Sequence, residues 1–108
     1  MKMKLIWLIL FFAGFLVACS DDDNDVLPIV EIGMSNTAFI PAEVSVPAGT
    51  TVSWINNSSI AHTVTSNDGL FDEFLEVDQV FTYTFNDPGN YSYICTLHPG
   101  MDGIVVVE

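Results

Sequence analysis

The chain has 108 residues and is strongly acidic, with 14 Asp and Glu against two Lys and Arg and a formal net charge of -12. A nucleic-acid-binding surface needs clustered basic side chains, so the composition excludes nucleic acid as a partner. The acidic charge favours a basic protein partner, and it serves solubility equally well.

The N-terminus has the features of a secretory signal peptide. Lys2 and Lys4 precede an apolar run from Leu5 to Val17, which is too short to span a bilayer as a mature helix. The segment then resembles bacterial lipoproteins, because small Ala18 precedes Cys19, whose thiol would carry lipid and become the new N-terminus. A permanent anchor helix with a chance Cys is the alternative.

This interpretation divides the chain into three parts. We expect a signal peptide over 1–18, a lipidated Cys19 with an acidic tether over 19–27, and one domain over 28–108. The protein would then be exported and held at a membrane by lipid. Cleavage removes both Lys residues, so the charge changes from -12 to -14. Cys95 is then left as an unpaired thiol in an oxidising compartment, and it needs something to protect it.

From Val26 onward, short alternating runs are separated by turn residues, and no stretch keeps a helical period. The pattern predicts an all-β sandwich, with strands near residues 29–34, 43–46, 51–56, 63–65, 80–85, 91–95 and 104–107. Pro41 and Pro47 flank the second strand and place it at a sheet edge. Trp54 is expected to be the large core residue.

The acidic segment from Asn67 to Asp78 contains no clear strand period. We expect an irregular excursion or a short helical turn, pinned by its Phe and Leu side chains. A solvated loop and a dedicated docking patch are both compatible with this composition.

The most informative stretch is Cys95-Thr-Leu-His98-Pro-Gly-Met101. It places a thiol, an imidazole and a thioether at intervals of three residues in one short loop. A single such residue is usually packing, but three soft or borderline donors together indicate a metal site. A fourth donor must come from elsewhere, and His62 is the other histidine of the chain.

Taken together, the turns, strands and donors resemble the cupredoxins, which are small blue copper proteins. The matching residues are F39-x-P41-A42, V44-x-V46, P47-A48-G49-T50-T51-V52, W54-x-N56, H62-T63-V64 and P88-G89-x-Y91-x-Y93-x-C95-x-x-H98-x-x-M101-x-G103. The short spacing from His98 to Met101 is closer to amicyanin and pseudoazurin than to plant plastocyanin. The resemblance implies a Greek-key sandwich of about seven or eight strands.

The resemblance also implies one copper ion per chain. His62, Cys95 and His98 would form a trigonal plane, with Met101 as a long axial ligand. Such a mixed nitrogen and sulfur set suits both oxidation states of copper. Many family members have Asn after the first histidine, where this chain has Thr63. We expect the Thr63 backbone N–H or hydroxyl near the Cys95 sulfur.

By resemblance, the function is electron transfer between larger redox proteins by a monomer that is not an enzyme. His98 would be the exposed exit for the electron, with Leu97, Pro99 and Gly100 around it. Multicopper oxidases and copper nitrite reductases place a histidine beside the copper-binding Cys, whereas Cys95 has Ile94 and Thr96 beside it. The alternatives are a carrier or store that delivers copper to an oxidase, and a metal-free sandwich that serves adhesion.

Overall fold

The computed structural model describes residues 29–108. The predicted signal peptide, Cys19 and the tether therefore lie outside the described residues. Between Ile29 and Glu108 the chain forms nine strands. No helix able to cross a membrane is found within this range.

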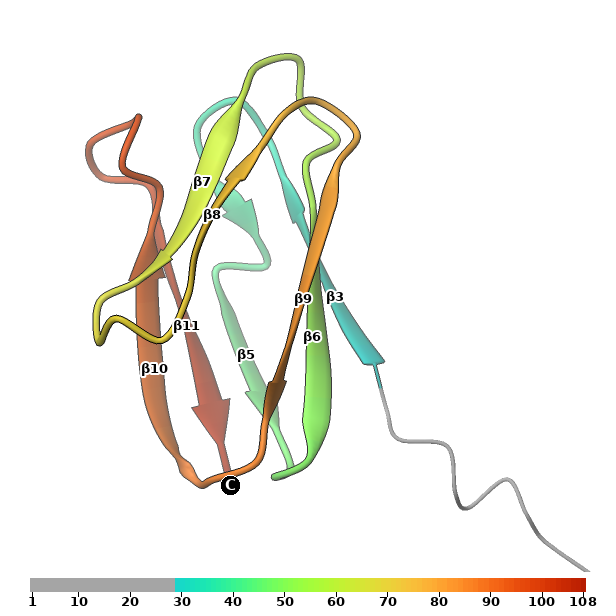
Figure 1. Ribbon diagram of the computed structural model, residues 1–108, viewed down its shortest axis with the longest axis vertical. Coiled ribbons are helices and arrows are strands. Elements are labelled where there is room, and N and C mark those ends of the chain that lie inside the picture. The colour runs from blue at the N-terminus through green and yellow to red at the C-terminus, as the bar shows by residue number, and fades with distance from the viewer. Residues whose placement is uncertain (1–28) are drawn as a thin grey trace, which may run out of the picture.

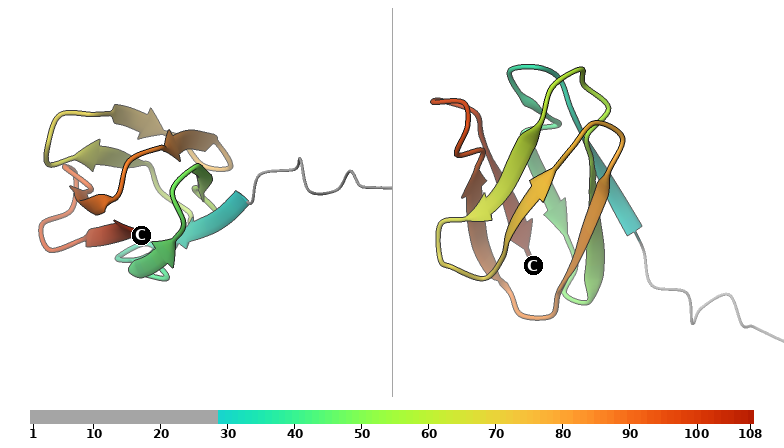
Figure 2. Two further views of the ribbon diagram at one scale, coloured as in Figure 1. Left: turned by 90° about the horizontal axis from the view of Figure 1, so that it is seen from below. Right: turned by 45° about the horizontal axis from the view of Figure 1, so that its top comes forward.

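The nine strands form two sheets that pack face to face (Figures 1 and 2). The first sheet has five strands, in the order β5 (Glu43–Val46), β11 (Asp102–Val107), β10 (Gly89–Ile94), β7 (His62–Ser66) and β8 (Asp72–Leu75). The second has four, in the order β4 (Phe39–Ile40), β3 (Ile29–Met34), β6 (Thr50–Ile55) and β9 (Val80–Phe85).

Both sheets are mixed. The β3/β6 and β5/β11 pairs are parallel, and the remaining pairs are antiparallel. Strands that follow one another in sequence often lie in different sheets, so that β5 and β6 belong to opposite layers. The all-β Greek-key sandwich predicted from the sequence is confirmed, and β5 is an edge strand, as its flanking prolines indicate.

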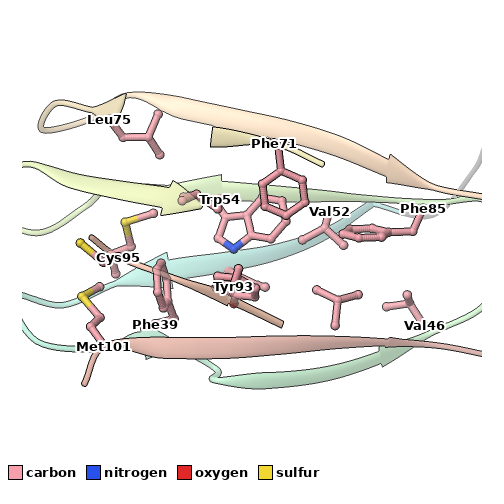
Figure 3. Close-up of a cluster of buried hydrophobic side chains, with 14 of the residues drawn as sticks. Phe39, Val46, Val52, Trp54, Phe71, Leu75, Phe85, Tyr93, Cys95 and Met101 are labelled. Atoms are coloured by element: carbon pink, nitrogen blue, oxygen red, sulfur yellow. The ribbon is translucent and has the colours of Figure 1, made fainter. Parts of the chain in front are cut away.

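Trp54 is the centre of the core, as predicted, and has no exposed surface. Its indole lies 5.3–6.4 Å, between ring centroids, from four other aromatic rings, those of Phe71, Phe81, Phe85 and Tyr93. Figure 3 shows Cys95 and Met101 at one end of this cluster and Val46 and Phe85 towards the other. The sulfur-bearing side chains are thus part of the hydrophobic core.

Tyr93 packs closely against the glycine of the neighbouring strand. It pairs directly with Gly103 across β10 and β11. A Cβ atom at Gly103 would overlap the ring carbon and hydroxyl oxygen at the tip of Tyr93. Tyr93 is fully buried, and burial, only partly opposed by a contribution from Trp54, raises the pKa of its phenol to about 12. The ring is thus an uncharged part of the core.

The acidic segment differs from the sequence-based prediction. Residues 72–75 form neither a helical turn nor an irregular loop, but the edge strand β8, which pairs with β7 from His62 opposite Leu75 to Thr65 opposite Asp72. The strand was missed because three of its four residues are exposed, so it shows no alternation. Phe71 and Leu75 are buried and anchor it, whereas Leu70 and Phe74 are exposed.

Gly103→Ala should lower the free energy of unfolding by about 1–3 kcal/mol, because the added methyl group must displace Tyr93 in a close-packed core. Urea unfolding of the metal-free protein measures this change. Gly33→Ala is the matched control, since its Cβ would lie 3.4 Å from the Asn57 side chain and meet nothing closer. Equal losses in both variants would contradict the packing argument.

Candidate metal centre

The candidate metal centre lies at one end of the sandwich. The loop between β6 and β7 and the loop between β10 and β11 both lie at the upper end in Figure 1. His62 is the first residue of β7, Cys95 directly follows β10, and Met101 directly precedes β11. Residues far apart in the sequence therefore reach one end of the core because their strands share a sheet.

The β10–β11 loop is compact because its backbone bonds to itself. The Cys95 N–H donates to the Met101 carbonyl at 2.9 Å, and the Met101 N–H donates to the His98 carbonyl at 3.1 Å. Gly100 has a φ of +85°, a left-handed conformation that glycine adopts at little cost. The three donor-bearing side chains are thus held on a short, closed turn.

The ligand atoms of three predicted donors, His62, Cys95 and His98, lie close together. The Cys95 sulfur lies 3.6 Å from Nδ1 of His62 and 3.4 Å from Nδ1 of His98. All three donor atoms lie within 4.8 Å of one another. Two donors that share one metal at bond lengths of about 2.0–2.3 Å must lie within about 4.4 Å of each other. Both sulfur-to-nitrogen distances satisfy this limit.

Met101 adds a thioether on the same side. Its side chain is buried, and Figure 3 shows its sulfur and that of Cys95 at the same end of the core. Two imidazoles, one thiol and one thioether are the donor types of blue copper sites. The residues at this end of the sandwich are therefore suited to one copper ion.

Thr63 connects the two donor-bearing segments. Its backbone N–H points to the Cys95 sulfur at 3.4 Å, which confirms the contact expected from the sequence. Its hydroxyl accepts the Thr96 N–H at 2.8 Å and lies 3.1 Å from the Thr96 hydroxyl. The threonine therefore ties the two segments together.

The surroundings of His62 favour its neutral form by lowering its pKa. Burial, and secondarily the nearby His98 ring, lower the pKa of His62 from its ordinary value of 6.5, while a hydrogen bond from the imidazole to the Ser35 backbone opposes the shift. The two rings lie 4.8 Å apart between centroids, so two positive charges there would repel each other. A metal-binding imidazole must be neutral, so the lowered pKa favours binding near neutral pH.

The loop before His62 contains two polar residues, Asn56 and Ser58, whose contacts near His62 were not predicted from the sequence. Asn56 is fully buried, and its amide nitrogen donates to the carbonyls of Ile60 and Leu75. The Ser58 hydroxyl lies 2.7 Å from the Asn56 side-chain oxygen and 3.0 Å from Nε2 of His62. The motif W54-x-N56 pointed to Asn56, but nothing in the sequence distinguished Ser58 from its polar neighbours.

Comparisons with known proteins agree with this geometry. A family model described as "Cupredoxin-like domain" matches residues 5–107. The chain belongs to the cupredoxin-like family. Amicyanin of Paracoccus versutus is 36% identical over 98 residues, which cover 85% of this chain and 72% of that protein. Halocyanin of Natronomonas pharaonis is 38% identical over 94 residues, covering 79% of this chain and 57% of halocyanin.

Solved cupredoxin structures superpose on the same region. The reduced Cu(I) form of an amicyanin variant has a TM-score of 0.69 and 31% identity, covering 74% of this chain and 82% of amicyanin. A copper-containing nitrite reductase from Thermus scotoductus has a TM-score of 0.67 and 31% identity. That match covers 76% of this chain but 22% of the enzyme, so the likeness concerns one part of a larger protein.

Thr63→Val should lower the free energy of unfolding of the metal-free protein by about 1–2 kcal/mol. The substitution keeps the shape and the N–H near the sulfur, but leaves the Thr96 N–H without its acceptor. Chemical denaturation measures the change. Thr84→Val is the matched control, because the Thr84 hydroxyl bonds Thr51 at an exposed position. A loss no larger than that of the control would show that the Thr63 hydroxyl does not tie the segments.

Proposed function

We propose that this protein is an exported, lipid-anchored electron carrier with one copper ion at the candidate metal centre. The observation that carries the proposal is the meeting of two imidazole nitrogens with one buried thiol at 3.4 and 3.6 Å. The buried thioether of Met101 lies at the same end of the core. Electron transfer is the activity that membership of the cupredoxin family implies.

Bound copper would supply a one-electron couple between its Cu(II) and Cu(I) states. The chain supplies a donor set that suits both states and a frame that keeps the donors in place. The Thr63 N–H points at the Cys95 sulfur, where a donor stabilises negative charge on the thiolate. Because the donors sit on strand ends and a closed turn, little of the protein needs to move when the electron arrives.

The electron would enter and leave through His98. Of the two histidines, His62 is fully buried, whereas His98 is partly exposed on the loop surface. Leu97 beside it is 48% exposed and gives a partner an apolar contact. The donor and the acceptor would be redox proteins, and the acidic charge of the chain favours basic faces on them.

Two features favour a carrier over an enzyme or a copper store. The residues beside Cys95 are Ile94 and Thr96, so a histidine that could lead from Cys95 to a second metal is missing there. Among residues 29–108, the one methionine outside the candidate centre is Met34, which is buried. A copper-delivery protein would be better served by exposed thioethers, so the alternative function of copper delivery or storage gains little support.

Copper loading tests this proposal. The full chain, purified in detergent, should turn intensely blue with one equivalent of Cu(II), and ascorbate should bleach the colour reversibly. Cys95→Ser should lose the colour and keep its far-UV circular dichroism, because Ser replaces one buried donor and nothing else. A colourless wild-type protein at one equivalent of copper would exclude the proposed function.

Membrane attachment through Cys19 is part of the same proposal and is supported by the sequence alone. The basic start, the short apolar run and Ala18-Cys19 follow the lipoprotein pattern. An acidic tether would then separate the domain from the membrane surface and leave the metal end free to meet partners.

Labelled fatty acid should be incorporated into the wild-type protein when it is expressed in a bacterial host, and Cys19→Ser should abolish the label. Cys95→Ser is the control, because it removes the other cysteine and should leave the label intact. A label that persists in Cys19→Ser, or that is absent from the wild type, would rule out lipid attachment at this position.

A further inference from the structure

The Ser58 hydroxyl is the polar group at the centre of the loop that precedes His62. Ser58 is half-buried, and its oxygen lies 3.0 Å from Nε2 of His62. The same oxygen lies 2.7 Å from the side-chain oxygen of Asn56 and 3.0 Å from the carbonyl of Ile60. It also accepts the Ile60 N–H at 3.3 Å.

The single hydrogen of the Ser58 hydroxyl determines which of its contacts it donates and which it accepts. A hydroxyl has one hydrogen to donate and two lone pairs to accept with. The oxygens of Asn56 and Ile60 can only accept, and an oxygen-to-oxygen contact of 2.7 Å would be repulsive without a hydrogen between the two atoms, so the Ser58 hydrogen points to Asn56. The bond between Ser58 and His62 therefore requires the imidazole to donate, which places its hydrogen on Nε2.

Asn56 fixes the direction of the Ser58 hydroxyl. The Asn56 amide nitrogen donates to the carbonyls of Ile60 and Leu75, so its oxygen cannot exchange places with its nitrogen without losing both bonds. Asn56 is also held by its backbone, which bonds Asp78 and Gln79. The acceptor that faces Ser58 is thus built into the buried part of the loop.

The other face of His62 could support the opposite tautomer. Nδ1 lies 3.6 Å from the Cys95 sulfur, a weak acceptor that could take a hydrogen from Nδ1. A hydrogen on Nδ1 would block the lone pair that faces the other donors. The tautomer of His62 therefore decides whether the metal-free protein is ready to bind.

We propose that Ser58 is a positioning residue, which holds His62 in the Nε2–H tautomer and orients its Nδ1 lone pair towards Cys95 before any metal arrives. This inference deepens the proposed copper site. Groups around a metal-binding histidine that fix its tautomer and ring orientation commonly contribute about 10–100-fold to metal affinity. Ser58 makes that contribution here through a bond that the buried amide of Asn56 directs.

The test compares Ser58→Ala, Ser58→Thr and Ser59→Ala with the wild type. Ser58→Ala retains the backbone N–H bond to the Asn56 side chain at 3.1 Å, so one of the two hydrogen bonds between Ser58 and Asn56 is kept. Ser58→Thr restores a hydroxyl. Ser59→Ala is the matched control, because the Ser59 hydroxyl is exposed and bonds Asn36, away from His62.

Nitrogen NMR of the metal-free protein at pH 8 reports the tautomer of His62 without copper. The wild type and Ser59→Ala should show the Nε2–H form with a slowly exchanging Nε2 proton. In Ser58→Ala the exchange should become fast and the Nδ1–H form should appear, and Ser58→Thr should restore the wild-type spectrum. Competition with a chromophoric chelator should show about 10–100-fold weaker copper binding by Ser58→Ala alone.

Two results would overturn the inference. One is an Nδ1–H tautomer in the metal-free wild type. The other is a Ser58→Ala protein with the wild-type His62 spectrum, which would mean that the backbone of Ser35, also a partner of His62, suffices. Because the NMR measurement uses no copper, it reports the His62 tautomer even if the protein is not an electron carrier. Wild-type copper loading tests that function separately.

Discussion

The contact between the Thr63 N–H and the Cys95 sulfur, at 3.4 Å, is the interaction on which the metal end of the molecule depends. Cys95 is buried at the point where β10 gives way to a loop, and Thr63 is the second residue of β7. These two strands are neighbours in the five-stranded sheet, so the contact spans one strand spacing. Any shift of β7 against β10 would separate the thiol from His62.

The direction of the Cys95 side chain is held by the packing of Tyr93 on the same strand. Tyr93 lies two residues before Cys95 on the same face of β10, and its ring is enclosed by Phe39, Trp54 and the glycine of β11. Side chains on one strand face alternate with period two, so fixing Tyr93 also fixes the direction of Cys95. The aromatic core, by fixing Tyr93, therefore determines the direction of the Cys95 thiol.

Much of this arrangement could be predicted because it depends on local pattern. The alternation from Val80 to Phe85 predicted both ends of strand β9 correctly. The four donor residues were recognisable because the chain has only two histidines and three of the donors lie in one short loop. The strand β8 could not be predicted in this way, because its stability comes from pairing with β7, while most of its side chains are solvated. Pairing between distant segments leaves no period in the sequence.

The same limit applied to the groups around the donors. The position of Thr63 was predictable by resemblance, but its hydroxyl bond to the Thr96 N–H depends on how two loops approach each other. The sequence marks Asn56 as part of a matching motif without showing what its side chain bonds, and it does not distinguish Ser58 from the other polar residues of the loop. The roles of Asn56 and Ser58 follow from burial and from which hydrogen each oxygen can receive, and both are properties of the folded chain.

The two histidines consequently have different physical situations. His62 begins a strand, is fully buried and bonds to a serine whose own partner is buried. His98 lies on a turn that is closed by backbone bonds and is partly exposed. One imidazole is therefore fixed by the protein interior and the other meets the solvent. A donor set with this asymmetry can keep its geometry through His62 and Cys95 while it presents His98 to a partner.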